Sequence, residues 1–528
     1  MSRRLVLTLA VSVVVVAGLV PVLVMVGQSL AAEFHTGFAY YRGLLASGRA
    51  WTLAGHSLAL SSITTLLTVG IGTPLGILLG KSDLPLRRSL LLLFAIPMAI
   101  PPYVLAVSWF NILGRGGTLA HWLGPALASH SSDWLFGLGG CVLVLATTFL
   151  PIVVLITVAQ LSSIGPSYEE AARLTSGWTS TLWHVTLPLI APGISLAAVV
   201  VFLLSLGEFG VPIFLRFDVF PVESFAQFSA FYNFGAATAA ALPLGLVTFL
   251  LLFLEALFLR SRSYALRRGP DAQTMVIALK SRRTLLLVVL GIIALVLVVL
   301  PLGVLIVRSS TAGAFHEAIA RGGASLVRSM AYAAAGATGL LLIGFLCGYL
   351  IQTRALPLWR KLDFLTVFLF TLPGPVIAIG LISLWNRSVT SFVYATPAII
   401  ILGYLAQYTA LSSRMCASAL EHVPPSMEEA AQVAGVHWGR RLVGIVVPLV
   451  RKGLVAAWIV GYVFCLRDTG MTMLVYPPGH DTLPVRTFTL MANGTPELIA
   501  ALCILMVAAA LLPLVILATT LRPTARMA

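Results

Sequence analysis

The chain has 528 residues, of which 59% are hydrophobic and only 10% are charged, and its mean hydropathy is +1.00. A soluble domain cannot bury that much apolar surface, so the composition excludes a soluble enzyme and indicates that lipid surrounds most of the chain. The formal net charge of +15 would suit a nucleic-acid partner, but Lys and Arg gather in the segments between apolar stretches. The charge is therefore interpreted as a topology signal, and no nucleic-acid partner is expected.

Twelve apolar stretches follow one another, each near the roughly 20 residues that a helix needs to cross a bilayer. They cover residues 5–26, 57–80, 89–113, 135–160, 189–210, 239–259, 284–307, 329–351, 362–385, 392–412, 450–466 and 497–520. The first stretch is too long for the core of a signal peptide and is expected to be a retained span. The predicted fold class is an all-α integral membrane protein with about 12 transmembrane helices.

The basic residues predict which loops face the cytoplasm. With a cytoplasmic N-terminus, Arg3-Arg4, Arg87-Arg88, Arg440-Arg441 and the basic run between residues 260 and 283 all fall on the inner side. Cytoplasmic loops of membrane proteins carry an excess of Lys and Arg, so this assignment is the favoured one. An even number of spans then returns the C-terminus to the cytoplasm as well.

The chain also repeats itself. Two sets of residues recur at one constant spacing: Ser57, Gly76 and Pro85 in the first half, and Ser329, Gly348 and Pro357 in the second. Six spans in each half give the two repeats the same orientation in the membrane, so they are parallel six-helix repeats. The predicted domains are a first repeat over residues 1–262, a basic cytoplasmic linker over 263–283 and a second repeat over 284–528.

A short polar motif separates the fourth and fifth spans of each half. It reads Pro-Ser-Tyr-Glu-Glu-Ala-Ala from Pro166 and Pro-Ser-Met-Glu-Glu-Ala-Ala from Pro425. Serine can cap a first helical turn, the helix dipole favours acidic residues there, and alanine continues a helix at low cost. One such motif would suit an ordinary interfacial loop. Two copies in register indicate two short cytoplasmic helices that present carboxylates to a soluble partner.

These motifs resemble the coupling loops of ATP-binding-cassette importer permeases with the type I fold. In that family Glu-Ala-Ala is followed by a glycine and then by a Leu-Pro-like step. The second loop, about residues 421–448, fits this pattern throughout, with Glu428, Glu429, Ala430, Ala431, Gly435 and Pro448. The first loop, about residues 163–188, offers Glu169, Glu170, Ala171, Ala172, Gly177 and Pro188. Because Ser176 stands where the glycine is expected and Gly177 follows it, the first loop is expected to dock differently.

The whole chain, including Tyr476–Arg486 after the eleventh span, resembles the fused permeases of iron(III)-type importers. The resemblance implies a bacterial inner-membrane permease that carries a small solute, iron(III) by first choice, from a soluble periplasmic or lipid-anchored binding protein to the cytoplasm. Two copies of a separate cytoplasmic ATPase would dock on the two loops. They would hold ATP and Mg²⁺, so this chain is expected to bind no cofactor and to carry no catalytic residue. Thiamine, phosphonate and polyamines are alternative substrates.

Two acidic residues are candidates for the translocation pathway. Glu208 and Asp468 occupy equivalent positions near the outer ends of the fifth spans, and charged groups within membrane segments are costly and usually functional. Neutralisation by neighbours such as Arg216 and Arg467 is an equally open interpretation. In this position the two carboxylates would suit a cationic solute.

Proline breaks two of the spans. Pro101-Pro102 and Pro373-Gly374-Pro375 interrupt the third and ninth stretches, and such breaks are tolerated where they face protein or a cavity. The sequence leaves hinges and simple kinks as equal alternatives.

The sequence argues against two other classes of protein and against a metal site. The nine His are scattered without metal-ligand spacing, and the five Cys lie in or at the ends of apolar stretches, so no metal site is predicted, although the pair His480-Asp481 could contact one. An ion-coupled secondary transporter also has six plus six spans, but it would need isolated carboxylates deep within them. A membrane-embedded enzyme would need His, Asp or Glu clustered at one depth.

Overall fold

The computed structural model describes residues 3–34, 38–118, 129–231, 233–258 and 276–520. Within these ranges the chain is helical, and its extended pairing is confined to one isolated bridge between Ser82 and Ile277. The predicted all-α class is confirmed. Lipid offers the backbone no hydrogen-bond partners, so each spanning segment satisfies its own N–H and C=O groups as a helix.

Nine helical segments among the described residues are long and apolar enough to cross a membrane. They are Arg3–Phe34, Gly48–Lys81, Leu138–Ser163, Trp178–Leu206, Phe234–Leu257, Lys280–Ser309, Ala314–Thr353, Trp438–Arg467 and Pro496–Ile516. Three further pairs of helices pass the same test but are bent where they meet. The number of spans is therefore nine, or up to twelve if each bent pair is one span, which agrees with the predicted number.

The helices form two compact units, and each unit draws on both halves of the sequence. One unit comprises Met1–Ser47, Glu223–Gly245 and Ser309–Ala528, and the other comprises Gly48–Val222 and Leu246–Arg308. We call them the C-unit and the N-unit, after the half that supplies most of each. The first helix of each half thus belongs to the unit built mainly from the other half. The predicted boundaries at 262 and 283 describe the sequence repeat, and that division stays a prediction.

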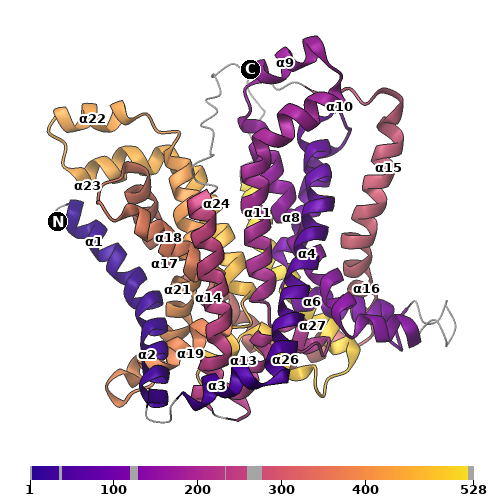
Figure 1. Ribbon diagram of the computed structural model, residues 1–528, viewed down its shortest axis with the longest axis vertical. Coiled ribbons are helices and arrows are strands. Elements are labelled where there is room, and N and C mark those ends of the chain that lie inside the picture. The colour runs from indigo at the N-terminus through magenta and orange to yellow at the C-terminus, as the bar shows by residue number, and fades with distance from the viewer. Residues whose placement is uncertain (1–2, 35–37, 119–128, 232, 259–275, 521–528) are drawn as a thin grey trace. The chain divides into compact units, whose positions relative to one another are not determined.

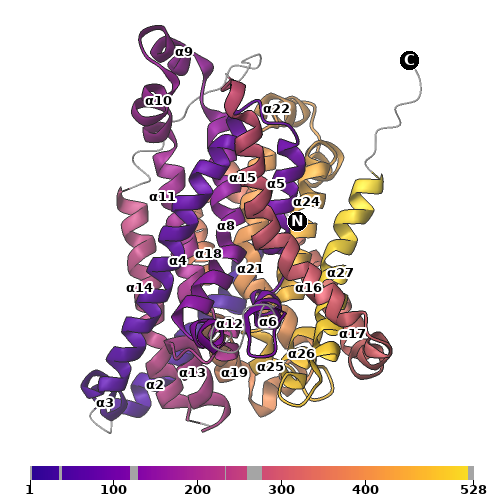
Figure 2. The same cartoon turned by 90° about the vertical axis from the view of Figure 1, so that its right-hand side faces the viewer.

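The described residues of the N-unit form ten α-helices, most of which are labelled in Figure 1, with α5 and α12 labelled in Figure 2. They are α4 (Gly48–Lys81), α5 (Arg87–Ala99), α6 (Pro102–Leu113), α8 (Leu138–Ser163), α9 (Pro166–Thr175), α10 (Trp178–Thr181), α11 (Leu187–Leu206), α12 (Gly210–Phe214), α15 (Arg283–Ala294) and α16 (Leu300–Ser309). The 3₁₀ turn Lys280–Arg282 precedes α15. Within the N-unit, α15 runs beside α5 (Figure 2).

The C-unit is built around α17, which contacts α21, α24 and α27. Its helices are α1 (Arg3–Val14), α2 (Val20–Phe34), α3 (Ala39–Ala46), α17 (Ala314–Thr353), α18 (Trp359–Thr371), α19 (Gly374–Trp385), α20 (Ser391–Tyr394), α21 (Ala398–Leu420), α22 (Pro425–Val433), α23 (Trp438–Arg441), α24 (Val447–Arg467), α25 (Thr472–Val475), α26 (Leu483–Leu490) and α27 (Pro496–Thr520), with a 3₁₀ turn at Ser388–Thr390. The first helix of the chain, α1, packs against α17, and α2 packs against α19. Two helices cross the unit boundaries, α13 (Phe220–Ser229) and α14 (Phe234–Phe258).

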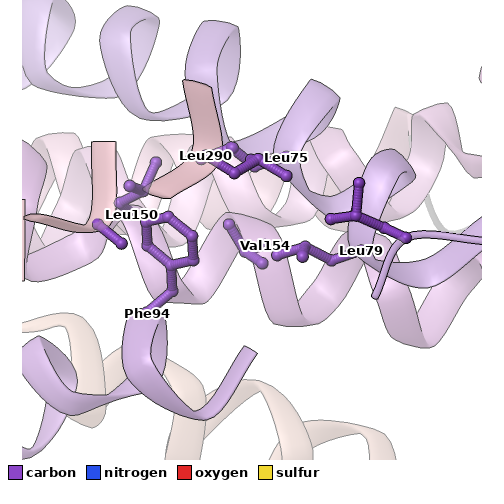
Figure 3. Close-up of a cluster of buried hydrophobic side chains, with 8 residues drawn as sticks. Leu75, Leu79, Phe94, Leu150, Val154 and Leu290 are labelled. Atoms are coloured by element: carbon purple, nitrogen blue, oxygen red, sulfur yellow. The ribbon is translucent and has the colours of Figure 1, made fainter. Parts of the chain in front are cut away.

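A buried cluster shows how α15 completes the N-unit. Leu75 and Leu79 of α4, Phe94 of α5, Leu150 and Val154 of α8, and Leu290 of α15 meet there (Figure 3). Each of these side chains is at most 4% exposed. The cluster joins helices of the first half to one from the second half, so the N-unit core needs both.

Prolines bend two spans sharply. The axes of α5 and α6 meet at 100°, and those of α18 and α19 meet at 106°. A proline lacks the backbone N–H and disfavours a helical conformation in the residue before it, so the helix cannot continue straight. The sequence left kinks and hinges open, and the structure shows corners at both places. Whether they move stays a prediction.

Four other prolines each follow a widened helical turn rather than a break. Four five-residue π-helical turns each end two residues before a proline. They are Val15–Leu19 before Pro21, Leu182–Thr186 before Pro188, Leu295–Val299 before Pro301 and Leu442–Val446 before Pro448. Because proline cannot donate to the carbonyl four residues earlier, a wider turn reduces the clash with its ring. The same adjustment occurs at matching places in both halves.

The repeat extends to individual hydrogen bonds. The Ser57 hydroxyl accepts from the backbone N–H of Phe220 at 3.0 Å, and the Ser329 hydroxyl accepts from that of Leu483 at 2.6 Å. Each bond fixes the first residue of a short helix, α13 in one case and α26 in the other. The serines that align in sequence therefore have the same structural role.

Glycine permits close contacts between helices in each unit. A Cβ on Gly76 of α4 would lie 2.6 Å from the Thr157 Cβ of α8. A Cβ on Gly348 of α17 would lie 2.5 Å from the Ser413 carbonyl oxygen of α21, which is backbone and cannot rotate away. Small residues at such crossings let two helix backbones approach closely.

We expect Gly348→Ala to destabilise the protein by about 1–3 kcal/mol, because the added methyl group must push two backbones apart. The matched control is Gly323→Ala in the same helix, where the new Cβ would meet only the Ile319 side chain at 3.5 Å. Thermal unfolding of the two purified variants in detergent compares them. Equal midpoints would contradict the close α17–α21 contact.

Candidate coupling and pathway sites

Both polar motifs fold into short helices, as predicted. The first motif forms α9 and the second forms α22, and each helix has a proline in its first turn. The helix α9 ends three residues beyond its motif, and α22 ends two residues beyond its motif. Figure 1 shows each helix at one end of its own unit. The predicted serine caps are wrong, because the N-cap residues are Gly165 and Pro424 and neither makes a side-chain cap. Each helix begins two residues earlier than it would if Ser167 or Ser426 were its N-cap.

The two helices end differently, as the departure of the first motif from the family pattern indicates. Gly435 has φ +76°, and the Val436 N–H donates to the Ala431 carbonyl at 3.0 Å. That is a left-handed glycine closing a helix, as predicted for the second loop. After α9, Ser176 is extended at φ −145° and Gly177 has φ −75°. The helix α9 therefore ends without a left-handed residue.

The glutamates in each motif are divided between two faces. Glu169 is 1% exposed, whereas Glu170 next to it is exposed. In α22, Glu428 is partly buried and Glu429 is exposed. The family's Glu-Ala-Ala motif begins with Glu170 and Glu429, so the exposed glutamates are the ones that the resemblance assigns to docking.

An ion pair holds Glu169, the buried glutamate of the first motif. The Lys81 ammonium, at the last residue of α4, pairs with the Glu169 carboxylate, and both side chains are at most 4% exposed. The Thr186 hydroxyl donates to the same carboxylate oxygen at 2.8 Å. This pair connects α9 to α4, a membrane-spanning helix of the same unit.

Neutral groups hold Glu428, the partly buried glutamate of the second motif. The Tyr349 hydroxyl donates to Glu428 at 2.6 Å, and the Trp438 ring N–H donates to the same hydroxyl at 3.3 Å. The Arg3 guanidinium lies 5.2 Å from the centre of the Tyr349 ring. The buried Arg441 supports the helix from the other direction by donating to the Gln432 side chain at 2.8 Å.

The solvent-exposed faces of α9 and α22 combine acidic and apolar groups. Leu174 is 89% exposed and Val433, at the matching position, is 90% exposed. Tyr168 and Met427 match in the same way, at 53% and 46% exposed. The exposed members of the motifs also include Ala171 and Ala430, whereas Ala172 and Ala431 are partly buried. A soluble partner with apolar and basic groups would fit such a face.

The two pathway candidates each cap the short helix that follows them. The Glu208 carboxylate accepts from the Gly210 N–H at 3.0 Å, and the Asp468 carboxylate accepts from the Thr472 N–H at 2.9 Å. Asp468 is 6% exposed and also accepts from the Tyr408 hydroxyl at 2.8 Å. These contacts give both acids a structural role, and their predicted role in the pathway is not tested by them.

The pair His480-Asp481 is engaged within the chain. The Tyr332 hydroxyl lies 2.7 Å from the His480 Nδ1, and the Arg328 guanidinium pairs with the Asp481 carboxylate. In the described part of the chain, no group of three or more His, Cys, Asp or Glu is placed to hold a metal ion.

Sequence reasoning missed Lys81, Tyr349 and Arg441 as contacts of the motifs. Lys81 is a single basic residue just after a predicted span, and nothing marked Tyr349 beyond its place in an apolar stretch. Both lie far from the motifs along the chain, so only folding brings them to the coupling helices.

Comparison with known proteins identifies the family of the chain. Residues 72–264 match the model of the binding-protein-dependent transport system inner membrane component. The chain is 30% identical over 228 residues to the molybdenum transport system permease protein ModB of Escherichia coli (strain K12), covering 41% of this chain and 96% of that protein. The chain therefore belongs to the family of binding-protein-dependent transport system inner membrane components.

Ferric transport permeases match more of the chain. It is 25% identical over 422 residues to the putative ferric transport system permease protein FbpB 1 of Haemophilus influenzae, which is 74% of this chain and 65% of that protein. It is 24% identical over 406 residues to the ferric transport system permease protein FbpB of Actinobacillus pleuropneumoniae, covering 73% of this chain and 59% of that protein. The matched region thus spans less than two thirds of the length of these curated relatives.

We expect Gly435→Val to loosen the end of α22 by about 1–2 kcal/mol, because a side chain is strained in the left-handed conformation. Gly177→Val is the matched control: neither glycine has an atom within 4 Å of the added Cβ, and Gly177 already has a negative φ. Hydrogen–deuterium exchange of the α22 and α9 amides measures the effect. Equal changes in both helices would contradict this interpretation.

Proposed function

We propose that this chain is the transport subunit of an ATP-driven importer that carries iron(III) into the cytoplasm. The observation that supports this most strongly is the pair of coupling helices, each with one glutamate turned inward and one exposed beside apolar groups. Two such helices, at matched positions in the repeat, suit two copies of one soluble ATPase. ATP and Mg²⁺ would be bound by that ATPase, and this chain would contribute no catalytic group.

The coupling follows from how the helices are held. When ATP draws the two ATPase copies together, a force applied to Glu170 or Glu429 reaches the membrane helices through the inward-facing side of the same coupling helix. Access to the solute path then changes from one side of the membrane to the other, a transition between two packed states. A soluble or lipid-anchored binding protein delivers the solute on the outer side, and both termini lie in the cytoplasm.

The proposal of iron(III) rests on the ferric permeases, which match about three quarters of the chain. Molybdenum and sulfate transport permeases match shorter parts of it, and the sulfate permease CysW of Synechocystis is 27% identical over 210 residues. Oxyanions are therefore the second candidates, ahead of thiamine, phosphonate and polyamines. The acids Glu208 and Asp468 do not decide between a cation and an anion, because both are already bound to backbone N–H groups.

Uptake of radiolabelled iron(III) by iron-limited cells, with and without the gene, tests the substrate. We expect deletion to abolish this uptake and the intact chain to restore it. Retention of uptake after ATP depletion, with the ion gradient intact, would instead support a secondary transporter. Loss of molybdate or sulfate uptake with normal iron uptake would leave the importer class in place and overturn the choice of iron.

We expect Glu429→Lys to weaken ATPase binding by about tenfold or more, because the new ammonium would face the basic groups expected on the partner, and like charges at an interface repel. Glu170→Lys should have a smaller effect, because the first loop departs from the family pattern at its helix end. Asp133→Lys, 69% exposed and far from either motif in sequence, is the control. Co-purification of the ATPase subunit with each variant measures the difference. Equal losses from both glutamate variants would mean that the different helix ends have no consequence for docking.

A further inference from the structure

The ion pair between Lys81 and Glu169 is the most deeply buried one among the described residues. Taking two charges out of water is costly, and the return in stability is often small. A buried pair is therefore weak evidence for stability and a better indication that a particular geometry is required. Here the geometry is that of α9 relative to the end of α4.

The last part of the predicted linker is held at the same point. The Ile277 N–H donates to the Lys81 carbonyl at 2.8 Å, and the Asp83 N–H donates to the Ile277 carbonyl at 3.2 Å. The Leu279 N–H donates to the Asp83 carboxylate at 3.0 Å. The backbone of Lys81 thus holds the chain leading into α15, while its side chain holds α9.

The second motif is fastened by other means. The residue that aligns with Lys81 at the spacing of the repeat is Thr353, whose hydroxyl accepts from the Arg3 guanidinium at 3.0 Å. Glu428 is bound instead by the uncharged Tyr349 hydroxyl, one turn earlier in α17. The two halves therefore hold equivalent glutamates with groups of different charge.

We propose that Lys81 is a positioning residue for coupling: it makes α4, the first coupling helix and the segment Val276–Leu279 move as one body when the ATPase moves. This inference rests on the proposed function, since it assumes that α9 receives the ATPase. It goes beyond that function by assigning the transmission step in the first half to one side chain and by including the end of the linker. In the second half a neutral hydrogen bond does the corresponding work.

The experiment compares four variants of the full chain reconstituted with its ATPase and binding protein. Lys81→Met removes the charge and retains most of the length of the side chain, Lys81→Arg keeps the charge, and Tyr349→Phe removes the corresponding hydroxyl of the second half. Arg115→Met is the control, because its pair with Asp133 is solvent-exposed. Two quantities are measured: the ATP hydrolysed per iron(III) taken up, and deuterium exchange at the amides of α9 and α22.

We expect Lys81→Met to lower uptake by about tenfold or more, because breaking a buried pair leaves an unpaired charge. ATP hydrolysis should fall less, so more ATP is spent per ion. Lys81→Arg should restore most of the lost uptake, Tyr349→Phe should have a smaller effect, and Arg115→Met none. Exchange should rise in α9 but not in α22 for Lys81→Met. A merely structural residue would lower the amount of folded protein without changing the ratio of hydrolysis to uptake.

Several outcomes would overturn the inference. Lys81→Met with a normal ratio of hydrolysis to uptake, or with unchanged exchange in α9, would show that the pair positions nothing. If Lys81→Met does not fold, Glu169→Gln replaces it, because the amide keeps the volume and can still accept from Lys81 and Thr186, and the same ratio decides. Failure of the proposed function is recognised separately: the unmodified complex would then neither hydrolyse ATP in response to binding protein nor take up iron(III), whereas the exchange experiment needs no partner.

Discussion

The constraint on which the rest of this structure depends is the inability of lipid to hydrogen-bond a polypeptide backbone. It makes every spanning segment helical, and it makes proline the residue that decides where a helix departs from the regular form. Some prolines, such as Pro74 and Pro151, lie inside regular helices, and others coincide with one of two departures from the regular form. Four times a π-helical turn widens the helix before it, and twice the span turns through a corner of about a right angle. Both departures recur at matching places in the two halves.

Much of this could be predicted from the sequence, because the relevant signals are local. Apolar length predicts the spans, and the recurring Pro-Ser-x-Glu-Glu-Ala-Ala predicts the two surface helices. Gly435 predicts a left-handed helix end, since few other residues adopt that conformation without strain. The motifs also identify the family, which the match to residues 72–264 and the similarity to ModB bear out.

What the sequence could not predict depends on contacts between distant segments. The exposure of Glu170 and the burial of Glu169 differ because adjacent residues on a helix point about 100° apart, and only the position of α4 decides which one faces inward. The packing of α15 against the core of the N-unit could not be predicted from the sequence for the same reason. Its apolar sequence is compatible with any lipid-facing or protein-facing neighbour, and Leu290 becomes a core residue only through Leu75 and Phe94.

Each half of the sequence contributes its first helix to the unit that the other half mainly forms, so joining the two halves in one chain does more than link two repeats. The first helix of the second half, α15, belongs to the N-unit, and the first helix of the chain, α1, belongs to the C-unit. The helices α9 and α22 are therefore each in a unit that contains a span from the opposite half. In the C-unit that span brings Arg3 onto Tyr349, which holds Glu428. In the N-unit the chain leading into α15 lies on Lys81, which holds Glu169. A symmetric pair of separate subunits would have to place these contacts identically. A single chain has two distinct copies of each position, so its two coupling helices can be held by a buried ion pair on one side and a neutral hydrogen bond on the other.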